Sequence, residues 1–162
     1  MSDQQKEFLH LCIVEQKSYE IIAQKMNVPK ATLTTWYEEL KDERLKIAAI
    51  RNLWSRKKIK ILFSEFYNWY LAHDKKCIYC NISEGEIKQL LDSGKLNTKR
   101  IATRGRKLEL ERKQPDLPYD NFDNLAFACY WCNNAKTDTF SDEEFREVGK
   151  VFSRIWEKRL SK

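Results

Sequence analysis

The stretch Leu108–Lys136, LELERKQPDLPYDNFDNLAFACYWCNNAK, decides the fold class of this chain. Its first residues alternate apolar and charged side chains, as a half-buried strand does. A loop rich in Pro, Asp and Asn follows, and apolar character returns from Leu125 to Ala128. The residues after Cys132 favour a helix. The order strand, loop, strand, helix predicts a small ββα unit.

Two Cys-x-x-Cys pairs accompany this unit, Cys77-Ile-Tyr-Cys80 before it and Cys129-Tyr-Trp-Cys132 within it. Each pair can bring two thiolates onto one ion from a tight turn. Four thiolates complete the tetrahedral shell that zinc prefers in a structural role. The competing interpretation is a redox dithiol, but such motifs generally occur singly at a helix start in a βαβ context, which is not apparent here. We therefore predict a structural Zn²⁺ bound by Cys77, Cys80, Cys129 and Cys132.

The run also resembles the HNH (ββα-metal) endonuclease family, especially members with a four-cysteine zinc site and a Cys-Asn-x-x-Lys ending. The resemblance covers about residues 74–148. The matching positions are Glu111-Arg112 at the end of the first strand, Asp123-Asn124-Leu125 in the loop, and Asn133 and Lys136 in the helix.

The resemblance implies metal-dependent hydrolysis of DNA phosphodiester bonds. Glu111 and Asn133 would bind a catalytic Mg²⁺ or Mn²⁺ through oxygen atoms, which suit a hard cation. Asn124 would orient the loop by hydrogen bonds, and Lys136 would lie within reach of a phosphate. The alternatives are a turn-forming role for Asn124 and a solvated helix charge for Lys136. With Arg112, these residues are the predicted catalytic set.

Arg112 departs from the family pattern, which has a general-base His at this position. A guanidinium cannot be deprotonated near neutral pH, so Arg112 cannot take a proton from water. The two histidines, His10 and His73, match no catalytic position.

Three outcomes remain open at this point. Another group, such as Glu109, Glu111, Asp116 or hydroxide at the metal, activates the water while Arg112 clamps the phosphate. Alternatively, the domain cuts slowly or only with a partner. In the third case it is an inactive HNH-fold regulator or adaptor that binds DNA without cleaving it. No residue excludes RNA or tRNA as the substrate.

The first part of the chain, residues 1–45, has apolar residues at helical spacing with a break at Asn27-Val28-Pro29. It resembles the helix-turn-helix of transposases and phage small-terminase proteins. Ala23 is the small residue of the first helix, and Leu33 and Trp36 are the apolar anchors of the second. An ordinary helical hairpin used for packing or dimerisation is the alternative.

A DNA-reading helix at this position presents Lys30, Thr34 and Thr35 away from the anchors, where they can reach base edges or phosphates. Residues 46–73 are apolar at helical spacing and rich in aromatics. We interpret these aromatics as core and not as a base-stacking platform.

The predicted architecture is mainly α with a small α+β part. It has a helix-turn-helix region at 1–45, a helical connector at 46–73, and a zinc-bound ββα-metal domain with a C-terminal helix at 74–162.

The charge distribution favours a polyanionic partner. The chain has 162 residues, with 30 Lys and Arg against 24 Asp and Glu, so its formal net charge is +6. The stretch Lys95–Lys113 alone holds eight basic and two acidic residues. We predict that Arg104, Arg106 and Lys107 in this basic run contact DNA, with a solvated loop as the alternative.

No stretch approaches the roughly 20 apolar residues of a membrane span, and the first residues lack the apolar region of a secretory signal. We therefore expect a cytoplasmic protein with no membrane partner. That compartment keeps thiols reduced, which favours zinc over disulfides. Cys12, in an apolar helical stretch, is most simply a buried small hydrophobe. A homodimer is compatible with the sequence.

Overall fold

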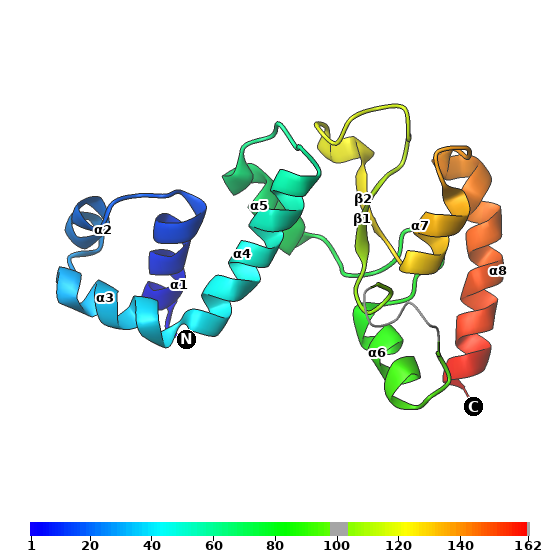
Figure 1. The fold of residues 1–162 in the computed structure, drawn as a ribbon, viewed down its shortest axis with the longest axis horizontal. Coiled ribbons are helices and arrows are strands. Elements are labelled where there is room, and N and C mark those ends of the chain that lie inside the picture. Colours follow the sequence, from blue (N-terminus) through cyan, green and yellow to red (C-terminus); the bar gives the residue numbers. More distant parts are fainter. Residues whose placement is uncertain (98–103, 162) are drawn as a thin grey trace. The chain divides into compact units, whose positions relative to one another are not determined.

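The computed structural model describes residues 1–97 and 104–161. The chain divides into two compact units, Met1–Ala72 and His73–Lys162. Within the described ranges, helices predominate and a single two-stranded antiparallel sheet lies in the second unit (Figure 1). The predicted class, mainly α with a small α+β part, is confirmed.

The first unit is helical throughout its regular structure. Its core contains the fully buried side chains of Phe8, Ile22, Leu33 and Phe66. Phe8 makes ring contacts with Tyr19 and Trp36, with centroids 5.8 and 5.9 Å apart, and these contacts join the first three helices. The elements are α1 (Asp3–Leu9), the π-helix η1 (His10–Val14), α2 (Tyr19–Met26), α3 (Lys30–Glu39), α4 (Lys41–Arg56) and α5 (Phe63–Ala72).

The turn between α2 and α3 lies where the sequence predicts a break. Asn27 ends α2 in the left-handed conformation, with φ 51°, and Pro29 precedes the first residue of α3. Of the predicted anchors, Leu33 is buried and Trp36 is half-buried. This geometry is shared by helix-turn-helix motifs and helical hairpins, so the DNA-reading role stays a prediction.

The predicted connector, residues 46–73, is helical over α5 and most of α4. Residues 46–72 belong to the same compact unit as residues 1–45. In α5 the aromatic side chains of Phe63, Phe66 and Trp69 are buried, in agreement with their interpretation as core.

The second unit holds the predicted strand, loop, strand and helix. Strands β1 and β2 pair antiparallel with Glu111 opposite Ala126 and Arg112 opposite Leu125. Because side chains alternate along a strand, Glu109 and Glu111 share one face of β1. The elements are α6 (Glu84–Asp92), β1 (Glu109–Arg112), the 3₁₀ turn η2 (Phe122–Asn124), β2 (Leu125–Ala128), α7 (Tyr130–Lys136) and α8 (Asp142–Leu160).

Helix α8 packs beside α6 and α7 and closes the core of this unit (Figure 1). It begins with a capping box formed by Ser141 and Glu144, and it buries Phe145 and Trp156. The ring of Tyr79 meets Phe145 edge-on at 5.0 Å. A Cβ at Gly149 would lie only 2.5 Å from the carbonyl oxygen of Tyr79, so this close approach requires glycine.

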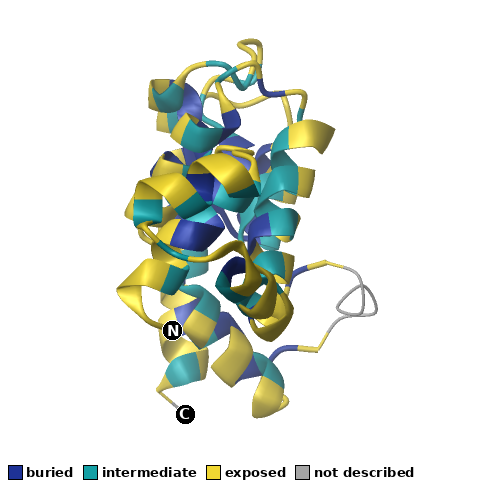
Figure 2. Ribbon diagram, turned by 90° about the vertical axis from the view of Figure 1, so that its left-hand side faces the viewer, coloured by how far each residue is buried: buried dark blue, intermediate teal, exposed yellow. Residues whose placement is uncertain are grey.

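Buried and exposed residues alternate along most helical ribbons, as expected for amphipathic helices (Figure 2). Among the described residues, no helix combines the length and the apolar character that a bilayer span needs.

Candidate active site

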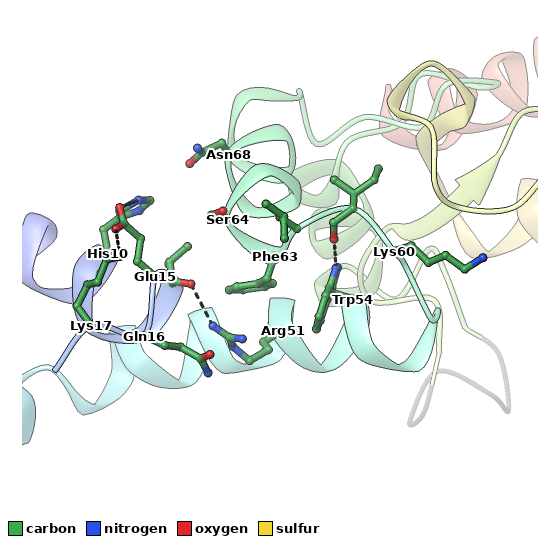
Figure 3. A pocket seen from close by; sticks show the side chains of 13 residues that line it. His10, Glu15, Gln16, Lys17, Arg51, Trp54, Lys60, Phe63, Ser64 and Asn68 are labelled. Carbon is green, nitrogen blue, oxygen red and sulfur yellow. Dashed lines mark hydrogen bonds and ion pairs between the residues drawn. The ribbon is translucent and has the colours of Figure 1, made fainter.

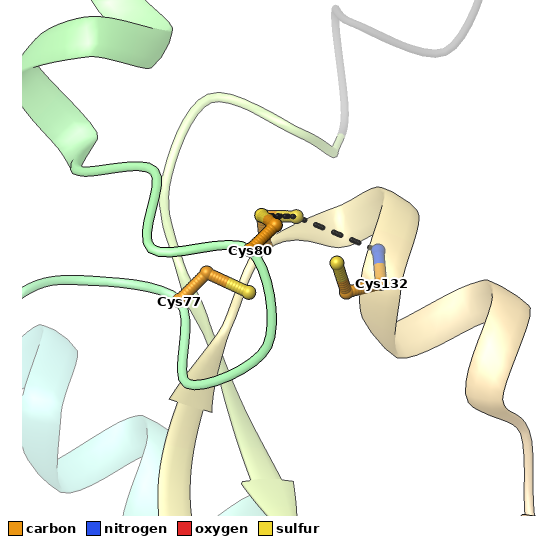
Figure 4. A group of neighbouring side chains, drawn as sticks. Cys77, Cys80 and Cys132 are labelled. Carbon is orange, nitrogen blue, oxygen red and sulfur yellow. Dashed lines mark hydrogen bonds between the residues drawn. The ribbon is translucent and has the colours of Figure 1, made fainter. Parts of the chain in front are cut away.

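The four predicted zinc ligands converge in the second unit. Cys77 and Cys80 lie on the turn before α6, Cys129 is the N-cap of α7, and Cys132 lies in the first turn of that helix (Figure 4). All four side chains are buried, and their sulfur atoms lie within 4.8 Å of one another.

The spacing of the sulfurs fits zinc. A tetrahedral ion with Zn–S bonds of about 2.3 Å places its sulfurs about 3.8 Å apart. The Sγ atoms of Cys80 and Cys129 are 3.6 Å apart. The cluster therefore fits a closed structural zinc site with little movement.

The electrostatics of the cluster also favour a cation. Hydrogen bonding to Cys129, Cys132 and Cys80 lowers the pKa of the Cys77 thiol. Hydrogen bonding to Cys129 and the other thiols, together with burial, raises the pKa of Cys132. The Cys77 thiolate is thus stabilised by the neighbouring thiols, and its negative charge opposes the ionisation of the other cysteines. A divalent cation at the centre removes this opposition because it stabilises every thiolate.

The backbone ties this cluster to the sheet. The N–H of Ile78, inside the first cysteine pair, donates to the carbonyl of Phe127 in β2 at 2.8 Å. The N–H of Asn133 donates to the carbonyl of Cys129 at 2.9 Å. An ion bound by the cysteines would therefore hold β2 and α7 in a fixed relation.

A cavity of about 270 Å³ lies between the end of β1, the following loop and α7. Three predicted site residues, Glu111, Arg112 and Asn133, line it together. No motif in the sequence marks the other lining residues, which are Pro115, Tyr119, Asn134, Thr137 and Asp138.

Comparison with solved structures agrees with this fold. One similar structure is the rare-cutting HNH restriction endonuclease PacI, with a TM-score of 0.55 and 26% sequence identity, over 70% of this chain and 81% of that one. The chain has an HNH-like fold. No family model matches the sequence, and no curated protein does.

Two predicted residues of the HNH pattern, Glu111 and Lys136, form a buried ion pair. The Nζ of Lys136 lies 3.1 Å from Oε1 of Glu111, and the two side chains are 0% and 9% exposed. The same ammonium donates to the carbonyl of Arg112 at 3.2 Å. Lys136 therefore faces the protein interior, and contact with a phosphate stays a prediction. The packing of α7 on β1 turns this side chain toward Glu111.

Arg112 lies in the cavity with several partners. One guanidinium nitrogen donates to the carbonyl of Leu117 at 3.3 Å, and the other donates to Oδ1 of Asp138 at 3.2 Å. The guanidinium also lies 5.0 Å from the ring centroid of Tyr119. These contacts hold the side chain in the cavity while leaving some of its five N–H donors for a ligand.

Asn133 contacts Glu109. Its Nδ2 donates to Oε2 of Glu109 at 2.8 Å, and Arg104 binds the same carboxylate with two nitrogens at 2.8 and 2.6 Å. Hydrogen bonding to Glu109 raises the pKa of Arg104. Glu109 is thus committed to these partners, and it does not line the cavity, as Asp116 also does not.

Asn124 in the HNH loop is buried and holds the loop by three hydrogen bonds. Its Oδ1 accepts from the N–H of Gln114 at 2.8 Å. Its Nδ2 donates to the carbonyls of Gln114 and Pro118 at 3.2 and 3.3 Å. This arrangement suits the loop-orienting role that the resemblance implies, and it is more than a local turn because it spans ten residues.

The predicted DNA-binding residues lie in both units. In the first, Lys30, Thr34 and Thr35 are exposed on α3, but Lys30 pairs with Glu20 at 2.5 Å. That contact lowers the pKa of Glu20 to about 2. In the basic run of the second unit, Arg104, Arg106 and Lys107 are exposed, and Lys99 and Arg100 lie outside the described residues. Contact with DNA stays a prediction for all of these.

A larger cavity of about 630 Å³ lies within the first unit, between η1, α4 and α5 (Figure 3). Arg51 points its guanidinium to the carbonyls of Ile13 and Val14 and covers the ring of Phe63 at 3.9 Å. His10 pairs with Glu15 at 3.3 Å. The charged side chains that line this larger cavity therefore bind one another or the backbone. The smaller cavity of the second unit is the better candidate for catalysis.

Proposed function

We propose that this chain is a metal-dependent endonuclease that hydrolyses DNA phosphodiester bonds. The observation that carries the proposal is that Glu111, Arg112 and Asn133 line one cavity beside the four-cysteine cluster. The structural similarity to an HNH restriction endonuclease supports a nuclease-type function on DNA.

The cavity offers oxygen donors that suit Mg²⁺ or Mn²⁺. Glu111 contributes a carboxylate. Asn133 uses its amide nitrogen on Glu109, which leaves its carbonyl oxygen as the atom for a cation. The ion, when bound, would polarise the scissile phosphate and stabilise the leaving oxygen.

Arg112 is the group that we assign to the scissile phosphate. A guanidinium matches two phosphate oxygens with two parallel N–H donors. Its ion pair with Asp138 involves a carboxylate that is 84% exposed, so a phosphate can replace that partner at small cost.

The attacking water needs a proton acceptor, and none of the described residues that line the cavity is a histidine. Glu111 is assigned to the cation and is already paired with Lys136, so it is not the acceptor. The other carboxylate of the lining, Asp138, can accept the proton. Asp138→Asn tests this assignment.

The test is a nicking assay on supercoiled DNA with Mg²⁺ or Mn²⁺. The parent protein is compared with Glu111→Ala, Asn133→Ala and the control Glu65→Ala, which alters an exposed glutamate of the other unit. Metal-dependent nicking that both site variants lose supports the proposal. Salt-sensitive DNA binding without cleavage under any metal would instead favour a DNA-binding regulator or adaptor. A structured RNA, tested in parallel, decides between the two nucleic acids.

A further inference from the structure

Lys136 places a positive charge behind the residue that the proposed function assigns to the metal. It is the last residue of α7, and its side chain is completely buried. A buried ammonium is retained only where it is paired and hydrogen-bonded, because desolvation of an isolated charge is very costly. Glu111 and the carbonyl of Arg112 provide those partners.

This position gives Lys136 an influence on any ion at Glu111. Its ammonium already neutralises the carboxylate, and it repels a second cation that approaches the same group. The charges that line the cavity also cancel, since Glu111 and Asp138 are acidic while Arg112 and the ammonium behind Glu111 are basic. The site without DNA therefore offers a divalent ion little net attraction.

A DNA phosphate changes this balance. It would pair with Arg112 and add negative charge and oxygen donors to the cavity. A hard cation would then find a site made partly by protein and partly by phosphate, which is the usual arrangement for Mg²⁺. Ion binding and DNA binding would favour each other, and by linkage each would raise the affinity of the other equally.

We propose that Lys136 is a positioning residue whose buried ammonium weakens divalent-ion binding at Glu111, so that the ion is bound tightly only together with DNA. The inference rests on the proposed ion site. It also assigns Lys136 a second task, which is to hold Glu111 and the end of β1 against α7 through its two contacts.

The experiment measures binding of Mn²⁺ alone to the zinc-loaded full-length chain by electron paramagnetic resonance, with and without a phosphorothioate duplex that resists cleavage. The variants are Lys136→Met, which removes the charge, and Lys136→Gln, which removes it but keeps a hydrogen-bond donor. Lys150→Met is the control, because Lys150 is an exposed lysine paired with Glu147 on α8.

The parent should bind Mn²⁺ weakly without DNA and more tightly with it. The two Lys136 variants should bind Mn²⁺ at least about tenfold more tightly than the parent without DNA, because a repelling charge is gone. Their gain on adding the duplex should be smaller, and the control should behave as the parent.

A purely structural role predicts the opposite sign, since a loosened site binds the ion less tightly. Weaker or unchanged Mn²⁺ binding in a folded Lys136→Gln variant, with binding still abolished by Glu111→Gln, would overturn this inference and leave the proposed function intact. Mn²⁺ binding that Glu111→Gln does not alter would place the ion elsewhere and overturn both.

Discussion

The ammonium of Lys136 lies 3.1 Å from the carboxylate of Glu111, and both side chains are buried between β1 and α7. Two residues far apart in the sequence thus share a contact that joins the strand of the candidate active site to the helix that carries Cys132 and Asn133. Removal of one partner would leave the other as a buried charge without a counter-ion. The stability of the site is therefore sensitive to substitution on either β1 or α7.

Lys136→Met should reduce the free energy of unfolding of the zinc-loaded protein by about 3–5 kcal/mol, since the Glu111 carboxylate would be left buried without its counter-ion. Urea unfolding followed by tryptophan fluorescence measures the change. The double variant Glu111→Gln with Lys136→Met should recover most of the loss, because neither charge then remains. A double variant no more stable than Lys136→Met alone would contradict the ion pair.

Cys129→Ala should abolish stoichiometric zinc binding and destabilise the second unit by more than about 5 kcal/mol, because the binding energy of a structural zinc is folding energy. Metal analysis and urea unfolding test both effects. Cys12→Ser is the control: Cys12 lies in the first unit, so the zinc content should not change. Chelation of zinc from the parent should reproduce the effect of Cys129→Ala.

Asn124→Ala should cost about 1–3 kcal/mol of stability, because three hydrogen bonds are lost: the N–H of Gln114 loses its acceptor and two loop carbonyls lose a donor. It should also reduce nicking, since the loop that carries Tyr119 would lose its tether. Gln89→Ala, an exposed substitution on α6, should change stability by less than about 0.5 kcal/mol. Equal stabilities for the two variants would argue against a tethering role for Asn124.

Arg112→Lys should lower the nicking rate at least about 100-fold while leaving the zinc content unchanged, because an ammonium cannot replace a two-point guanidinium clamp on phosphate. Plasmid nicking under single-turnover conditions measures the rate. An Arg112→Lys protein as active as the parent would exclude this role.

Glu20 should titrate well below its ordinary pKa of 4.5, because its hydrogen bond with Lys30 lowers the pKa to about 2. The contact stabilises the fold fully above about pH 4.5, and this contribution is lost as the pH falls through about 2, where Glu20 becomes protonated in the folded state. An NMR titration of the Glu20 carboxyl measures the pKa. In Lys30→Ala the pKa should rise toward 4.5 but stay below it, because hydrogen bonds from the backbone and Ser18 also lower it, and an unchanged value would show that Lys30 is not its main cause.

The four-cysteine cluster and the ββα unit could be predicted from the chain alone because their signals are local. Two Cys-x-x-Cys pairs restrict the bound ion to the few metals that favour four thiolate ligands. The alternation of charged and apolar residues in Glu109–Arg112 has the two-residue period of a strand. The burial of the aromatics in α5 follows from helical spacing in the same way. The resemblance to HNH proteins rested on such short patterns, and the fold agrees with it.

Tertiary structure alone decided how the charged side chains pair. A helical period states which residues share a face, but it does not state whether Lys136 meets water or Glu111, since that depends on how α7 packs on β1. Likewise, Asp138 and Tyr119 carry no local sequence signal that marks them as site residues. They line the cavity because the loop after β1, which holds Tyr119, and the end of α7, which precedes Asp138, meet there in the folded chain. Ligand chemistry and periodicity are properties of neighbouring residues, whereas burial and ion pairing are properties of elements that meet only in the folded chain.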